Sequence, residues 1–257
     1  MSLQERIQSN AQATATMPEE LLRYNDMKGR LEFRQALCRL LDRTTMPGLA
    51  PAPENLVLAV GVSSVLDNLF FLLADGGASC LIPAPYYPMF DLDLGGRDGV
   101  HVWPVHLLDA QDDTAELDRA FRAAEAARRP PRALMLTTPD NPTGIVYSAA
   151  RLRTMLRWCV RRRVHCVVDE CYCWSAFQDQ ENGPFQSALM VAVELAAELS
   201  EKETEQLWEL THVIVSLSKD FSASGVMPRR HCMRMLCEGS FGHACNLCMH
   251  SMRLVNA

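Results

Sequence analysis

The 257-residue sequence has no excess of positive charge, no long apolar run and no apolar leader at its start. Its formal net charge of -6 at pH 7 provides no basic surface field that would favour nucleic acid as a partner. No apolar stretch approaches the roughly 20 residues needed to cross a bilayer. The first residues are polar and lack the apolar core of a signal peptide. We therefore expect a cytoplasmic protein with no nucleic-acid partner and no membrane contact.

Two common enzyme fingerprints are also missing. No G-x-G-x-x-G follows the first apolar run, and the Gly61-Val-Ser-Ser stretch found there lacks the spaced glycines that bind a dinucleotide. The G-x-S-x-G elbow of serine hydrolases does not occur. Neither a dinucleotide enzyme nor a serine hydrolase is therefore favoured.

Cysteine is abundant, with ten residues in two populations. Six lie in apolar stretches and are expected to be small buried hydrophobic residues: Cys38, Cys80, Cys159, Cys166, Cys171 and Cys173. The other four lie in residues 227–257, a divergent tail: Cys232, Cys237, Cys245 and Cys248. A cytoplasmic context argues against disulfides. The Cys245-x-x-Cys248 pair could ligate zinc, but the remaining spacing matches no zinc finger.

Short apolar runs alternate along the chain with helical stripes. Buried strands are expected at residues 56–60, 79–82, 100–105, 132–137, 164–168 and 212–215. Helices are expected at residues 30–41 and 61–73, around Leu117, after Ser148, and over residues 187–210. This rhythm predicts an α/β fold of three layers, in which a mostly parallel sheet has helices on both faces.

Polar and aromatic residues follow several of these strands, where the ligands of parallel sheets bind. Lys219 follows the strand at 212–215 and comes directly after the hydroxyl-bearing residues Ser216 and Ser218. A lysine amine can form a Schiff base with an aldehyde cofactor, and serines can hydrogen-bond a phosphate. Taken alone, the same pattern also fits a surface lysine after an edge strand.

Four motifs occur in an order and spacing that resemble a known family. They are Tyr24-Asn-Asp-Met-Lys-Gly29 with Glu32-Phe33-Arg34, Pro85-Tyr86-Tyr87-Pro88, Asn141-Pro142-Thr-Gly144, and Asp169-Glu170-Cys171-Tyr172 followed by Ser216-Leu-Ser-Lys219. Residues 21–225 resemble the fold-type-I pyridoxal-phosphate enzymes of the class I/II aminotransferase family, in the 1-aminocyclopropane-1-carboxylate synthase-like branch. The resemblance implies the large domain of a type I aminotransferase and pyridoxal 5'-phosphate as cofactor.

The resemblance also implies roles around the cofactor ring. Lys219 would bind pyridoxal phosphate and later move the α-proton of the substrate. Asp169 would face the pyridine nitrogen and keep it protonated. Asn141 and Tyr172 would hydrogen-bond the phenolic oxygen, and Tyr87, rather than Tyr86, would stack on the ring. Without the resemblance, Asp169 could cap a helix or pair with an arginine, Tyr172 could be a core tyrosine, and Asn141-Pro142 could be a simple turn. The resemblance implies in addition that the Asn141–Pro142 bond is cis, because the family commonly uses a cis bond there.

Further implied roles concern the phosphate and the partner subunit. Val62 and Ser63 at a helix N-terminus, with Ser216 and Ser218, would form the phosphate cup. Tyr24 matches the tyrosine that reaches the cofactor of the neighbouring subunit, and it therefore implies a homodimer.

The sequence departs from the family pattern at two positions. Met227 stands where the family has a phosphate-binding arginine, eight residues after the lysine, and Met27 stands where the synthases have a tyrosine. We divide the chain into a polar segment, 1–20, a cofactor-binding large domain, 21–226, and the Cys-rich tail, 227–257, with the family's small C-terminal domain missing. We expect an aminotransferase- or lyase-like protein acting on amino acids or 2-oxo acids, in an incomplete or inactive form. The alternatives are a catalytically dead, partner-binding protein and a zinc-stabilised interaction protein.

Overall fold

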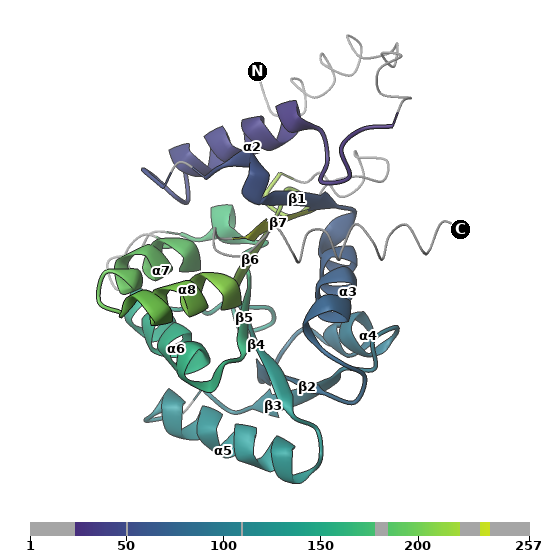
Figure 1. Cartoon of the computed structure of the whole chain (residues 1–257), viewed down its shortest axis with the longest axis vertical. Helices are drawn as coiled ribbons and strands as arrows, with labels where there is room; N and C mark the ends of the chain where they lie inside the picture. Colours follow the sequence, from purple (N-terminus) through teal and green to yellow (C-terminus); the bar gives the residue numbers. More distant parts are fainter. Residues whose placement is uncertain (1–23, 50, 109, 178–184, 222–231, 237–257) are drawn as a thin grey trace.

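The protein is built on one seven-stranded sheet. A computed structural model describes residues 24–49, 51–108, 110–177 and 185–221, together with the backbone of Cys232–Leu236 (Figure 1). The strand order is β1-β7-β6-β5-β4-β2-β3. The strands are β1 (Leu56–Ala59), β2 (Ser79–Pro83), β3 (His101–Val105), β4 (Pro131–Thr137), β5 (His165–Asp169), β6 (Thr211–Ser216) and β7 (Cys232–Leu236). Strands β3, β2, β4, β5 and β6 pair in parallel, and β7 is antiparallel to both of its neighbours. The expected mostly parallel sheet is confirmed.

Helices cover both faces of the sheet, as the sequence predicts (Figure 1). One face carries α5 (Asp113–Ala126), α6 (Ala149–Arg162), α7 (Ala188–Ala196) and α8 (Glu201–Leu210), and the other carries α3 (Gly61–Leu73) and α4 (Phe90–Gly95). Helix α2 (Leu31–Arg43) and the short 3-10 helices η2 (Pro53–Asn55) and η3 (Cys173–Ser175) complete the described elements. The helix expected over 187–210 is two helices, because Ser200 forms a capping box with Glu203 and starts α8 anew.

The alternation of side chains in the central strands separates two apolar layers. In β4, Ala133 and Met135 pack with α3 and α4, whereas Leu134 and Leu136 pack with the helices of the opposite face. A register slip of one residue would exchange these two sets, so burial on both faces fixes the position of each strand end. The edge of the sheet where β4, β5 and β6 end is thereby set by the core.

Strand β7 extends the sheet beyond the boundary that we placed at residue 226. Cys232–Leu236 lies between β1 and β6 and pairs with both. Strand pairing is made by the backbone and needs no family motif, which is why the motif argument stopped short of it. Cys237, Cys245 and Cys248 of the tail lie outside the described residues, so the zinc prediction does too.

The remaining cysteine prediction concerns the apolar stretches. All six of those cysteines are buried free thiols, as expected. Among the described residues, no group of three His, Cys, Asp or Glu side chains is placed to hold a metal ion. Nor does that part of the chain contain a helix with the length and apolar character to traverse a bilayer.

Candidate active site

A cavity of about 220 Å³ opens at the carboxyl ends of β4, β5 and β6, beside the N-terminus of α3. Nine of the ten predicted site residues line it: Val62, Ser63, Tyr87, Asn141, Asp169, Tyr172, Ser216, Ser218 and Lys219. The tenth, Tyr24, is fully exposed and is not part of the lining. Its role at a neighbouring subunit stays a prediction.

Asp169 is the buried acid of this cavity, with 3% of its surface exposed. It ends β5, where its carbonyl oxygen accepts a hydrogen bond from the Thr138 amide at 2.9 Å. Its Oδ1 accepts one from the Cys171 amide at 3.1 Å. Burial raises the pKa of Asp169 to about 6, against the lowering effects of the Cys171 hydrogen bonds and the Lys219 charge. Above that pH the carboxylate is ionised, so the cavity then contains a buried negative charge.

The turn that carries Lys219 is held against η3. The Ser218 amide donates to Ser216 Oγ at 3.1 Å. The Asp220 carboxylate accepts hydrogen bonds from the Trp174 amide, at 3.1 Å, and from the Ser175 hydroxyl. These contacts tie the residue after Lys219 to the segment that follows Tyr172.

The Lys219 amine is consequently held near the other predicted residues. Its Nζ lies 6.0 Å from the centre of the Tyr172 ring. The side chain is exposed enough for the amine to react with a ligand. The sequence contains two other lysines, Lys28 and Lys202, and neither lines the cavity.

Asn141 and Tyr172 form a pair on the wall of the cavity. Burial raises the pKa of the Tyr172 hydroxyl, and the nearby Asn141 side chain has a smaller, lowering effect on it. The Asn141–Pro142 peptide bond is cis, as the resemblance implied. Both polar groups can therefore face a single ligand oxygen.

The two adjacent tyrosines differ in position. Tyr87 lines the cavity and meets Phe90 edge-on, with ring centres 5.5 Å apart. Tyr86 instead points its hydroxyl at the Asp91 carboxylate, with oxygen distances of 3.3 Å. Of the two, Tyr87 is the one placed to contact a ring in the cavity.

The N-terminus of α3 supplies free donors at the other end of the cavity. The helix starts at Gly61, whose φ of +81° lies in the left-handed region that favours glycine. Val60 at the N-cap makes no side-chain capping bond, so the first-turn amides are left for a ligand. Amides at a helix N-terminus bind phosphate groups well. Val62 and Ser63 lie in this turn and line the cavity.

Four further residues line the cavity that the motifs did not identify: Phe90, Asp93, Thr137 and Cys171. Phe90 and Asp93 belong to α4, a six-residue helix too short to show a periodic stripe. Thr137 could have been found as the last residue of β4, and Cys171 from its place between Asp169 and Tyr172.

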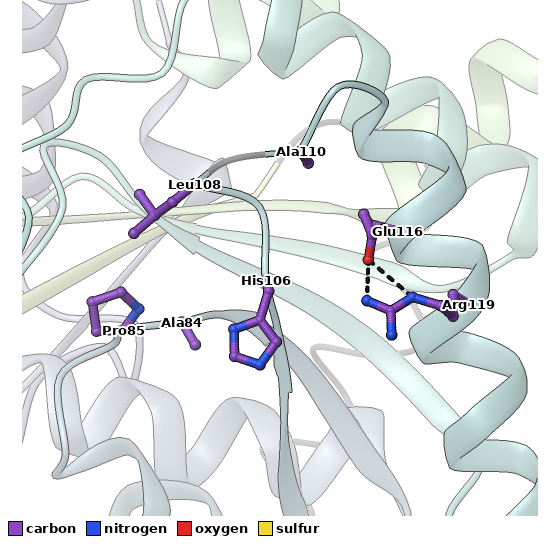
Figure 2. A pocket seen from close by; sticks show the side chains of 7 residues that line it. All are labelled: Ala84, Pro85, His106, Leu108, Ala110, Glu116 and Arg119. Carbon is purple, nitrogen blue, oxygen red and sulfur yellow. Dashed lines mark hydrogen bonds and ion pairs between the residues drawn. The ribbon is translucent and has the colours of Figure 1, made fainter.

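A second hollow, of about 520 Å³, lies between the ends of β2 and β3 and helix α5 (Figure 2). Its lining includes His106, Leu108 and Pro85, and it shares no residue with the predicted site. Glu116 and Arg119 in its wall pair with each other, as the dashed lines in Figure 2 show. Its lining residues, as far as the structure describes them, include no lysine and no carboxylate other than that of Glu116, so they differ from the groups in the smaller cavity.

The fold and the cavity define a fold-type-I aminotransferase-like protein, and comparisons with known proteins identify the family. A family model for aminotransferase class I and II matches residues 2–227, and the chain belongs to this family. Members of the family depend on pyridoxal phosphate.

The curated relatives include 1-aminocyclopropane-1-carboxylate synthases from plants. The chain is 34% identical over 217 residues to 1-aminocyclopropane-1-carboxylate synthase 1 of Oryza sativa subsp. indica, covering 82% of this chain and 43% of the relative. It is 33% identical over 205 residues to 1-aminocyclopropane-1-carboxylate synthase 7 of Arabidopsis thaliana, covering 79% and 44%. The chain thus spans less than half the length of these relatives.

Solved structures show the same fold. An aspartate aminotransferase mutant from Thermus thermophilus matches with a TM-score of 0.70 and 23% identity, over 97% of this chain and 60% of that one. An aminotransferase from Mycobacterium tuberculosis matches with a TM-score of 0.68 and 21% identity, over 91% and 56%. At this identity the likeness concerns the fold alone.

Proposed function

We propose that this chain binds pyridoxal phosphate covalently through Lys219 and forms the cofactor-binding part of an enzyme that acts on amino acids. The observation that carries the proposal is the convergence of Lys219, buried Asp169 and the Asn141–Tyr172 pair on one cavity. The family membership supports the same conclusion.

When bound, pyridoxal phosphate supplies an electron sink for negative charge at the α-carbon of an amino acid. Lys219 would hold the aldehyde through its amine and would hold or move the proton at the α-carbon of the substrate. Asp169 would keep a proton on the ring nitrogen by its negative charge. The side chains of Asn141 and Tyr172 would hydrogen-bond the phenolic oxygen, and Tyr87 would cover a face of the ring.

The phosphate is bound in this proposal by neutral donors. The amides of Val62 and Ser63 at the start of α3 would bind it, and the hydroxyls of Ser216 and Ser218 would add further donors. Amino acids and 2-oxo acids are the proposed substrates, with the synthase relatives favouring a lyase branch and Met27 a transaminase branch. We place the protein in the cytoplasm as a homodimer in which Tyr24 contacts the partner.

The chain's three lysines allow a direct test. Incubation with pyridoxal phosphate, borohydride reduction and peptide mass spectrometry should place the reduced cofactor on Lys219. Lys28, which donates to the Glu54 carbonyl, and Lys202 on α8 serve as internal references for nonspecific labelling. Labelling of these two at the level of Lys219 would contradict the proposal.

Turnover by these 257 residues alone is proposed to be slow, as for an incomplete or inactive form. Met227 stands where the family pattern has a phosphate-binding arginine, and the loss of such a charge-assisted contact costs about 1.5–3 kcal/mol. We expect turnover at least tenfold below the roughly 10 per second of a typical enzyme. Steady-state assays with a panel of amino acids, 2-oxo acids and S-adenosylmethionine measure the turnover rate. A typical rate would contradict the expectation of slow turnover and would leave the proposal on cofactor binding intact.

A further inference from the structure

Asp93 is an acid inside the cavity that the proposed chemistry does not use. It lies on α4, lines the cavity, and its Oδ2 accepts a hydrogen bond from the Ser63 hydroxyl at 3.2 Å. Helix α4 packs beside α3 (Figure 1), so the carboxylate faces the first turn that is proposed to bind the phosphate.

The hydroxyl of Ser63 has one proton. While that proton is donated to Asp93, the Ser63 oxygen can offer only lone pairs to a second acceptor. A phosphate dianion bound at the same turn would meet these lone pairs and the charge of Asp93 beside them. The residue that is proposed to help hold the phosphate is therefore engaged by a competing anion.

The balance of charge in the cavity increases this competition. Its charged lining residues, among those that the structure describes, are Asp93, Asp169 and Lys219. Lys219 is their sole cation, and in the proposed function its amine is used for the aldehyde. Burial raises the pKa of Asp93, and the negative charge of Asp93 is a small further effect that raises the pKa of Asp169.

We propose that Asp93 opposes the phosphate group at its own binding site and so determines how strongly the cavity prefers a phosphorylated aldehyde over an unphosphorylated one. This inference rests on the proposed function, since it concerns the same cavity. Asp93 would thus determine specificity. Its carboxylate accepts the proton of the Ser63 hydroxyl and thereby reduces the gain in affinity that a phosphate group gives to a ligand.

The test compares Asp93→Asn with Asp91→Asn. Asp91 lies on the same helix and is exposed outside the cavity, so its replacement makes the same change of net charge. Three probes are titrated: pyridoxal phosphate and pyridoxal by absorbance, and inorganic phosphate by its effect on the thermal unfolding midpoint.

Asp93→Asn should bind pyridoxal phosphate about tenfold more tightly, with stabilisation by inorganic phosphate at correspondingly lower concentration, while pyridoxal binding changes less than about twofold. Asp91→Asn should leave all three near the wild-type values. Equal effects of the two variants, or an unchanged or weakened response to phosphate in Asp93→Asn, would overturn the inference. Failure of Lys219 to take up the aldehyde would defeat the proposed function, and the inorganic phosphate arm would still decide the role of Asp93.

Discussion

Replacing Lys219 by alanine is expected to eliminate the reduced pyridoxal adduct and to weaken retention of the cofactor more than about hundredfold, or 2.7 kcal/mol. The variant removes the amine that lines the cavity, and the sequence has no second lysine there. The neutral donors at the start of α3 remain. A residual, noncovalent and readily dialysed complex is therefore expected.

A conservative variant separates the role of the amine from that of its charge. Lys219→Arg keeps a cation near Asp169, whose pKa the Lys219 charge helps to lower, but it carries no amine that can link to an aldehyde. It should retain more cofactor than Lys219→Ala and still give no adduct after borohydride reduction.

Lys202→Ala is the matched control, because Lys202 is exposed on α8 away from the cavity. Its adduct yield should equal that of the wild type. Mass spectrometry of the reduced protein and the absorbance of the bound cofactor measure both effects. An adduct that persists in Lys219→Ala at the wild-type yield would refute the assignment of the lysine.

The sequence predicts the central part of this fold well because its strands are buried on both faces. The run His212-Val-Ile-Val215 has no alternation, and β6 is indeed covered by α3 on one side and by α7 on the other. The parallel pairing of β5 with β6 also places the ends of these two strands side by side, with Asp169 opposite Ile214. Parallel pairing of neighbouring strands therefore brings together residues that are far apart in the sequence.

What the sequence does not reveal depends on short or backbone-driven structure. Helix α4 has six residues, so Asp93 shows no periodic pattern that would place it in the cavity. Strand β7 is inserted between β1 and β6 by backbone pairing, and no side-chain motif marks it. The hydrogen bond from Ser63 to Asp93 joins residues 30 positions apart, and only the packing of α3 on α4 makes it.

Glu170, the neighbour of Asp169, is a fully buried acid with an incomplete set of partners. Its Oε1 accepts hydrogen bonds from the Ala188 amide at 2.7 Å and from the Ser187 hydroxyl at 3.1 Å. Its Oε2 is buried and has no hydrogen-bond partner among the described residues. Burial raises the pKa of Glu170 to about 8, with the nearby charge of Asp169 acting in the same direction. At neutral pH, Glu170 is therefore largely protonated, so it places no negative charge beside Asp169.

The folded protein binds the proton of the Glu170 carboxyl more tightly than the unfolded chain does. The contribution of Glu170 to the free energy of unfolding therefore falls with rising pH. The contribution of Glu170 is fully present below its ordinary pKa of 4.5 and is lost as the pH rises to about 8. Each pH unit in this window is worth about 1.4 kcal/mol, so the loss between pH 5 and pH 8 is on the order of 4 kcal/mol.

Glu170→Gln should remove this dependence. The amide keeps an oxygen for Ala188 and Ser187 and cannot ionise, although its NH₂ group replaces an oxygen that has no partner among the described residues. We expect the variant to be equal to or less stable than the wild type at pH 5 and to be the more stable protein at pH 9.

Urea unfolding at intervals between pH 5 and pH 9 gives the difference in free energy between the two proteins. Asp169, whose pKa is raised to about 6, titrates in both proteins. The difference between their free energies of unfolding therefore reports the contribution of Glu170. Glu205→Gln, at an exposed position on α8, should follow the wild-type curve to within about 0.5 kcal/mol. Parallel curves for wild type and Glu170→Gln would mean that Glu170 is ionised in the folded protein at neutral pH, and that Asp169 works beside a second negative charge.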